Sequence, residues 1–146
     1  MGEREGGWGG AARRALPLLR AGWAGDLSLL REGAAQLAGL GAGLTPAGDD
    51  FLCGLMLWAW LAHPDPEALC RVVVEAAAPR TTTLSAALLR AAGRGECSAA
   101  WHRLLAALAT GDEGRILAAT QRVLAHGATS GAAALAGFLW QAGNGD

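Results

Sequence analysis

The strongest constraint on the fold is a helical spacing of apolar residues through nearly the whole chain. Alanine and leucine dominate, β-branched residues are sparse, and no stretch alternates with a period of two. Short breaks rich in glycine, proline or aspartate separate the segments, so we predict an all-α, compact bundle or orthogonal array of about seven or eight helices. The expected helices cover about residues 11–20, 26–38, 45–63, 66–78, 82–92, 98–109, 112–125 and 129–141.

The length of 146 residues is that of one domain, and no linker divides the chain. We expect residues 1–146 to form a single helical domain with frayed ends at 1–10 and 143–146. Asp26 and Asp112 are expected to cap the helices that follow them.

Composition excludes several kinds of chemistry. All 12 cationic side chains are arginines, so there is no lysine for a Schiff base or a phosphate-binding P-loop, and no tyrosine for acid–base catalysis. The net charge of −1 argues against a general nucleic-acid binder. No apolar run is long enough to span a bilayer, so we expect no membrane partner and a cytoplasmic location. The three cysteines lack metal-ligand spacing and are expected to be reduced and mostly buried.

The run from Gly39 to Leu52 is the most informative local motif. Alternating glycines allow positive φ and close approach of the backbone to a ligand. Thr45 is expected to cap the next helix and Pro46 to occupy its first position. Free N–H groups and the helix dipole favour an anion there. The predicted substrate-binding residues of this motif are Gly41, Gly43, Thr45 and Gly48.

Two adjacent acids, Asp49 and Asp50, complicate an anion site because carboxylates repel phosphate. A Mg²⁺ ion bridging carboxylate and phosphate would resolve the conflict, so both acids are candidate metal ligands and catalytic residues. Neighbouring helical residues point about 100° apart, so one acid is free to hydrogen-bond the glycine loop instead. The simpler alternative is that both acids only complement the helix dipole.

Two further clusters carry polar side chains at expected helix starts. In the first, Arg80 could clamp a carboxylate or phosphate, and Thr81 and Ser85 are expected to share a helix face. The alternative is an ordinary capped helix with a solvated arginine. In the second, His126 is a candidate acid or base, or else a surface histidine. The predicted binding residues of both clusters are Arg80, Thr81, Thr82, Ser85, Thr129, Ser130 and Gly131. His63 and His102 are expected to be structural, and the tryptophans to pack in the core.

An internal repeat aligns residues 48–56 with residues 131–139 without gaps. Each segment has a second glycine six residues after its first, Gly54 and Gly137. A glycine inside a helix costs about 1 kcal/mol relative to alanine, which close contact between helices would justify. We therefore predict that these two helices pack against each other near the two glycines, with their N-termini adjacent.

Taken together, the three motifs resemble a largely uncharacterised prokaryotic family that includes the AllH-type subunit of oxamate carbamoyltransferase. The resemblance rests on GLGAGLTPAGDDFLCG (residues 39–54), RTTTLSAALLRAAGRG (80–95) and HGATSGAAALAG (126–137). It implies carbamoyl transfer between carbamoyl phosphate and oxamate, or the reverse phosphorolysis. The sequence departs from the family at Ala47, usually serine, at Ala133, often an acid, and in lacking the N-terminal half of typical members.

Three functional hypotheses follow. The leading one is an enzyme or enzyme subunit that acts on a small anionic metabolite through carbamoyl or phosphate chemistry, with Mg²⁺ as the expected cofactor. The alternative is a non-catalytic module that binds an anion or partner subunits, which Ala133 and the missing half favour. The third is a structural homo-oligomer.

Overall fold

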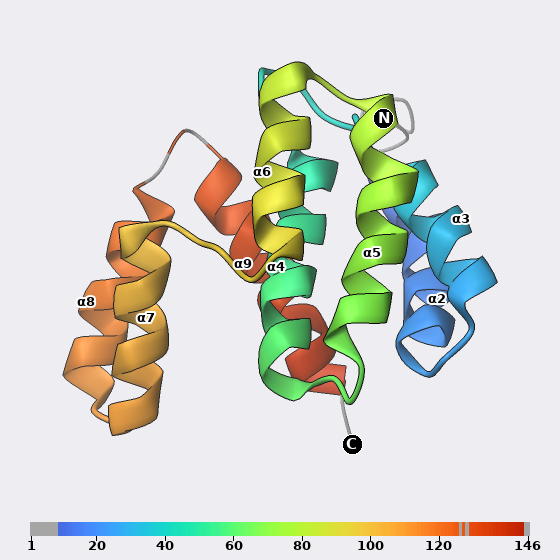
Figure 1. Ribbon diagram of the computed structural model, residues 1–146. Coiled ribbons are helices and arrows are strands. Elements are labelled where there is room, and N and C mark those ends of the chain that lie inside the picture. The colour runs from blue at the N-terminus through green and yellow to red at the C-terminus, as the bar shows by residue number, and fades with distance from the viewer. Residues whose placement is uncertain (1–8, 126, 128, 145–146) are drawn as a thin grey trace.

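The computed structural model describes residues 9–125, 127 and 129–144 (Figure 1). Within these residues the chain forms helices and no strand, which confirms the predicted all-α class. The expected fraying of the ends falls largely outside the described residues, as does His126. The elements are α2 (Ala11–Trp23), α3 (Leu27–Leu37), α4 (Ala47–Ala62), α5 (Pro66–Ala77), the 3₁₀-helix η2 (Ala78–Arg80), α6 (Thr83–Gly93), α7 (Ala99–Thr110), α8 (Glu113–Leu124) and α9 (Ser130–Asn144).

Side-chain caps define most of the helix starts. Asp26 accepts from the N–H of Leu29, and Asp112 accepts from the N–H of Arg115, as predicted. The predicted cap at Thr45 is wrong. The extended backbone of Pro46 (ψ 147°) delays the start of α4 to Ala47, so Pro46 itself is the N-cap and makes no side-chain cap bond.

Two helices are longer than their sequence pattern indicated. Helix α2 continues through Pro17 to Trp23, because its buried face packs along α3, with Gly22 against Leu30. A proline inside a helix removes one backbone hydrogen bond, and this packing offsets the loss. Helix α9 runs to Asn144 rather than ending near Gln141.

Helix α4 is the centre of the molecule, and α9 lies along it (Figure 1). A Cβ at Gly54 would lie 1.8 Å from the carbonyl oxygen of Ala134, and a Cβ at Gly137 would lie 2.0 Å from that of Phe51. Each glycine therefore admits the backbone of the other helix. The repeat predicted this contact, and it is confirmed, including the adjacent N-termini, since Thr45 Oγ1 lies 2.8 Å from Ser130 Oγ.

The remaining helices surround this pair. Helices α5 and α6 cover one side of α4, α2 and α3 lie beyond α5, and α7 and α8 form a hairpin on the opposite flank (Figure 1). The hairpin joins the core through Trp101, whose ring lies 5.2 Å from that of Phe138 on α9. The hairpin thus stands close to α4, α6 and α9 at the site described below.

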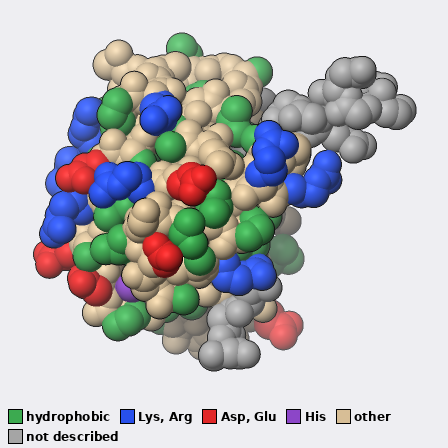
Figure 2. All heavy atoms as spheres, turned by 90° about the vertical axis from the view of Figure 1, so that its right-hand side faces the viewer, with side chains coloured by type: hydrophobic (Ala, Val, Ile, Leu, Met, Phe, Trp, Pro, Cys, Tyr) green, Lys and Arg blue, Asp and Glu red, His purple; other side chains and the backbone are tan. Residues whose placement is uncertain are grey.

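The surface is mixed in character, and one of the three cysteines, Cys70, is buried whereas Cys53 and Cys97 are half-buried, so the expectation of mostly buried cysteines is only partly met. Figure 2 shows arginines, acids and apolar side chains interspersed on one face, without a large patch of one charge. No helix within the described residues is long and apolar enough to cross a membrane. Cys53, Cys70 and Cys97 are free thiols.

Candidate functional site

Asp49 is buried and holds three segments of the chain together. Its side chain has 0% exposure. The N–H of Gly39 donates to Oδ1 over 2.9 Å, the hydroxyl of Ser85 donates to Oδ2 over 2.6 Å, and the hydroxyl of Thr81 also donates to Oδ2. One acid of the pair therefore binds the glycine loop, as the sequence allowed. Charge-assisted bonds of this kind are strong, so Asp49 fixes the loop and the start of α6 against α4.

The structure gives Thr81 and Ser85 a partner inside the chain. The prediction that they share a helix face is wrong, because Thr81 has an extended backbone (φ −141°) and precedes α6. Both hydroxyls instead meet at the carboxylate of Asp49. Thr82 caps α6 through the N–H of Ser85, and its hydroxyl donates to the carbonyl of Leu44 over 2.6 Å.

The glycine loop is shaped by its own neighbours. Gly41 has a φ of 118°, and a Cβ there would lie 2.6 Å from the nitrogen of Ala47. The N–H of Gly48 donates to the carbonyl of Leu40 over 2.8 Å, so it is already used within the chain. Gly43 and Gly41 are exposed, and Gly43 faces open space. The loop therefore connects α3 to α4 closely and leaves its tip open to solvent.

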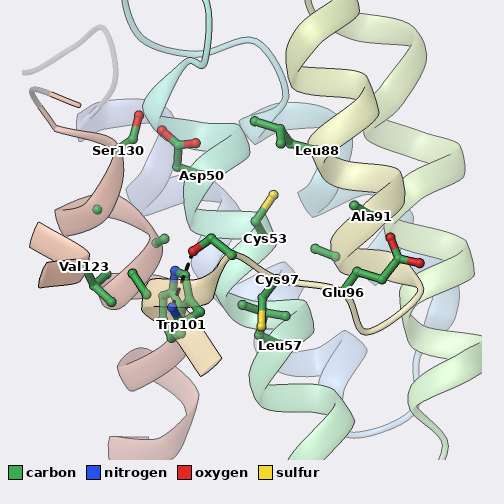
Figure 3. A pocket seen from close by; sticks show the side chains of 15 residues that line it. Asp50, Cys53, Leu57, Leu88, Ala91, Glu96, Cys97, Trp101, Val123 and Ser130 are labelled. Atoms are coloured by element: carbon green, nitrogen blue, oxygen red, sulfur yellow. Dashed lines mark hydrogen bonds between the residues drawn. The ribbon is translucent and has the colours of Figure 1, made fainter. Parts of the chain in front are cut away.

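Asp50 differs from Asp49 in having an oxygen without a partner. Its side chain is 7% exposed, and its Oδ2 makes no hydrogen bond. The hydroxyl of Ser130 lies beside the carboxylate (Figure 3) and 2.8 Å from the hydroxyl of Thr45. Burial raises the pKa of Asp50 to about 6, the nearby Ser130 hydroxyl opposes this rise, and the charge of Asp49 adds to it. Asp50 can therefore change protonation near neutral pH.

A cavity of about 410 Å³ opens beside Asp50, between α4, α6, α9 and the α7–α8 hairpin. Figure 3 shows Asp50 and Ser130 together at one end, and Leu57, Cys97 and Trp101 at the other. Its volume lies in the range of small-molecule sites. Its walls are mainly apolar, and they are formed by Asp50, Cys53, Leu57, Leu88, Ala91, Ala92, Glu96, Cys97, Ser98, Ala100, Trp101, Val123, Ser130, Gly131 and Ala134.

The two thiols in the cavity are not activated nucleophiles. Burial raises the pKa of Cys53, and the charges of Asp50 and Asp49 raise it further. Burial also raises the pKa of Cys97. Thiolate is the nucleophilic form, so at neutral pH both side chains act as apolar wall rather than as catalysts.

Comparison with known protein families assigns the chain to one of them. The family model described as oxamate carbamoyltransferase subunit AllH matches residues 37–142. The chain belongs to the AllH family. The matched range contains both acids and every residue that lines the cavity, so the resemblance noted from the three motifs is confirmed. No curated protein and no solved structure matches the chain.

The third motif of this AllH-family chain meets the first motif in space. Ser130 begins α9 and joins Thr45 and Asp50. Gly131 packs against the end of α8, where a Cβ would lie 2.1 Å from the carbonyl oxygen of Val123. Thr129 is exposed, and its carbonyl accepts from the N–H of Ala133. His126 lies outside the described residues, so its catalytic role stays a prediction.

The second motif lines the cavity through Leu88, Ala91 and Ala92, whereas its polar start lies elsewhere. Arg80 ends η2 and is exposed, and no ion pair joins it to another described residue. Arg80 immediately precedes Thr81 in the sequence. It therefore lies beside the Asp49 cluster, and it is not part of the cavity wall. His63 is structural, as predicted, since its Nε2 donates to the carbonyl of Trp23 over 3.0 Å and its Nδ1 accepts from the N–H of Asp65.

A metal ion would find one available carboxylate here. Asp49 already accepts three hydrogen bonds, whereas Oδ2 of Asp50 is without a partner. Within the described part of the chain, no group of three or more His, Cys, Asp or Glu side chains could hold a metal. Mg²⁺ is often bound by one carboxylate together with substrate oxygens. Of the two acids, Asp50 is the one that could provide such a carboxylate.

Sequence reasoning missed the cavity walls. Cys53 and Leu57 follow Asp50 at spacings of three and seven residues, which places them on the same face of α4. This spacing was a usable signal. Trp101 and Val123 come from α7 and α8, and no local pattern links those helices to Asp50.

Proposed function

We propose that this AllH-family chain is a carbamoyltransferase-type subunit that binds the carbamoyl group of a small anionic metabolite at Asp50. The supporting observation is the carboxyl group of Asp50, which belongs to the cavity lining and whose buried Oδ2 has no hydrogen-bond partner. A buried acceptor without a donor is costly, so such an atom favours a ligand that supplies one. The NH₂ of a carbamoyl group offers two such donors.

The helix termini supply the complementary charge for the anionic part of the metabolite. The N-termini of α4 and α9 are adjacent, because Thr45 contacts Ser130. Helix N-termini carry partial positive charge and favour bound anions. The two acids oppose this field, and a Mg²⁺ ion that enters with the phosphate oxygens would offset their charge.

The protonation of Asp50 suits proton transfer in carbamoyl transfer. When the nitrogen of oxamate attacks the carbamoyl carbon of carbamoyl phosphate, phosphate leaves and the nitrogen loses a proton. Asp50, with its pKa raised to about 6, can accept that proton as a general base. In this proposal His126 shuttles the proton onward, and Arg80 and the open loop around Gly43 contact the substrate carboxylate.

Calorimetric titration of carbamoyl phosphate, with and without Mg²⁺, tests this proposal. We expect saturable binding to the wild type that strengthens with Mg²⁺ and falls at least tenfold in Asp50→Asn. Glu75→Gln is the matched control, because Glu75 is an exposed acid of α5 paired with Arg31 of α3, and neither residue lines the cavity. Equal binding by wild type and Asp50→Asn would contradict the proposal.

A partner-binding role is the second candidate, and an exposed apolar rim favours it. Leu44, Leu84 and Leu88 are 71%, 47% and 44% exposed, and Leu88 lines the cavity. The hydrogen bond from Thr82 to the carbonyl of Leu44 brings the loop next to the start of α6. We infer that a partner subunit, or a second copy, covers this rim. Co-expression with the other subunits of the enzyme tests it, since Leu84→Glu should then abolish assembly without unfolding the chain.

A further inference from the structure

The cavity is larger and more apolar than a small anionic metabolite requires. Oxamate or carbamoyl phosphate would occupy the end near Asp50 and Ser130 and leave the rest of the 410 Å³ unfilled. We propose that the ligand carries an apolar body of several carbon atoms behind its carbamoyl group, as in an N-alkyl urea or carboxamide. This inference rests on the proposed function, since it uses the same contact between Asp50 and the carbamoyl NH₂.

The shape of the cavity follows from small residues on three helices. Ala91 and Ala92 on α6, Ala100 on α7 and Ala134 on α9 line it. Each leaves a space that a leucine would fill in a close-packed core. The opening is therefore built into the sequence of several helices.

The far end of the cavity is suited to hydrocarbon. The side chains of Leu57, Trp101 and Val123 are 7%, 8% and 1% exposed, so each is a firmly packed wall (Figure 3). The thiols of Cys53 and Cys97 line the same space and stay protonated at neutral pH. An apolar group placed here would bury surface against these walls.

The charges along the walls select the head group. The lining contains the acids Asp50 and Glu96 and no arginine or histidine. Glu96 is paired at the surface with Arg94 over 3.0 Å, so Asp50 is the lining acid with an unpaired oxygen, its buried Oδ2. A head group with N–H donors is therefore favoured next to Asp50, and a carboxylate in the position of that head group is disfavoured.

A series of N-alkyl ureas tests the proposal by calorimetry or by NMR shifts of the lining residues. From methylurea to butylurea we expect affinity to rise about three- to fourfold per methylene, as for groups buried from water. Pentanoate, which has a similar body with an anionic head, should bind at least tenfold more weakly than butylurea. An affinity that does not change with chain length would overturn the proposal, as would tighter binding of butylammonium than of butylurea.

Filling the cavity provides the matched variant. Ala91→Leu places a larger side chain on the wall without touching Asp50, whereas Ala87→Leu adds the same side chain at an exposed position of the same helix. We expect Ala91→Leu to abolish the rise in urea affinity with chain length, and Ala87→Leu to preserve that rise. Butylurea binding that is unaffected by Ala91→Leu would refute the assignment of the apolar body to this cavity.

The titrations also separate this inference from the proposed function. If carbamoyl phosphate binding depends on Asp50 but affinity for ureas does not change with chain length, the proposed function stands and the apolar body is refuted. If ureas gain affinity with chain length but carbamoyl phosphate does not bind, the apolar cavity is supported and the role in carbamoyl phosphate chemistry is refuted.

Discussion

Replacing Asp50 by asparagine should stabilise the folded protein at neutral pH. Burial raises the pKa of Asp50 from 3.8 to about 6, because the charged carboxylate loses solvation. For an acid whose folded-state pKa is raised, the stabilising contribution is complete below the unfolded pKa and is lost as the pH rises through the folded one. The wild type should therefore lose stability between about pH 4 and pH 6, whereas Asp50→Asn should not.

The size of the expected stabilisation follows from the rise in the pKa of Asp50. A rise from 3.8 to about 6 corresponds to at most about 3 kcal/mol, at about 1.4 kcal/mol per pKa unit. Water that enters the cavity screens part of the charge, so we expect a gain of about 1–2 kcal/mol at about pH 7.5. For a domain of this length, that gain raises the melting temperature by roughly 2–8 °C.

Thermal and urea unfolding of both proteins, measured from about pH 4 to pH 8, provides the test. The difference in free energy of unfolding should be near zero at the acid end and should grow through pH 6 to a plateau. Asp49→Asn is the internal control, because the neighbouring acid accepts three hydrogen bonds and should be stabilising. An Asp50→Asn protein that is less stable than the wild type at about pH 7.5 would refute the reasoning.

Three other changes have defined outcomes. Asp49→Asn should cost about 2–4 kcal/mol by urea unfolding, since its amide cannot accept all three bonds; a loss below 1 kcal/mol would contradict this. Gly54→Ala should cost at least about 2 kcal/mol, because the new Cβ meets the Ala134 carbonyl, whereas Gly143→Ala, in open space, should be nearly neutral. Cys53 should react with iodoacetamide far more slowly at about pH 8 than a free peptide thiol, since burial raises its pKa; an equal rate would show an accessible thiolate.

The sequence predicted the helices and one tertiary contact because these depend on local patterns. Apolar spacing located every α-helix of the described chain, and Asp26 and Asp112 marked two of their starts. The repeated glycines predicted the contact of α4 with α9, because glycine within a helix is unfavourable unless another backbone approaches. The Thr45 cap failed because the extended Pro46 moved the helix start to Ala47.

The candidate site was harder to predict, since it depends on which way side chains point. The sequence presented Asp49 and Asp50 as equivalent, whereas the start of α4 turns one toward Gly39, Thr81 and Ser85 and the other toward the cavity. That difference comes from the arrangement of α4 among its neighbours. The cavity depends on the position of the α7–α8 hairpin, which no local pattern sets.

The most direct test is an NMR titration of the ¹³C-labelled carboxyl group of Asp50, alone and with saturating carbamoyl phosphate and Mg²⁺. The account predicts a midpoint near pH 6 in the free protein, because the carboxylate is buried and one oxygen lacks a partner. It also predicts a lower midpoint in the complex, because donors or a cation stabilise the charged form. A midpoint near pH 4 that the ligand does not change would contradict the assignment of Asp50 as the ligand-binding group.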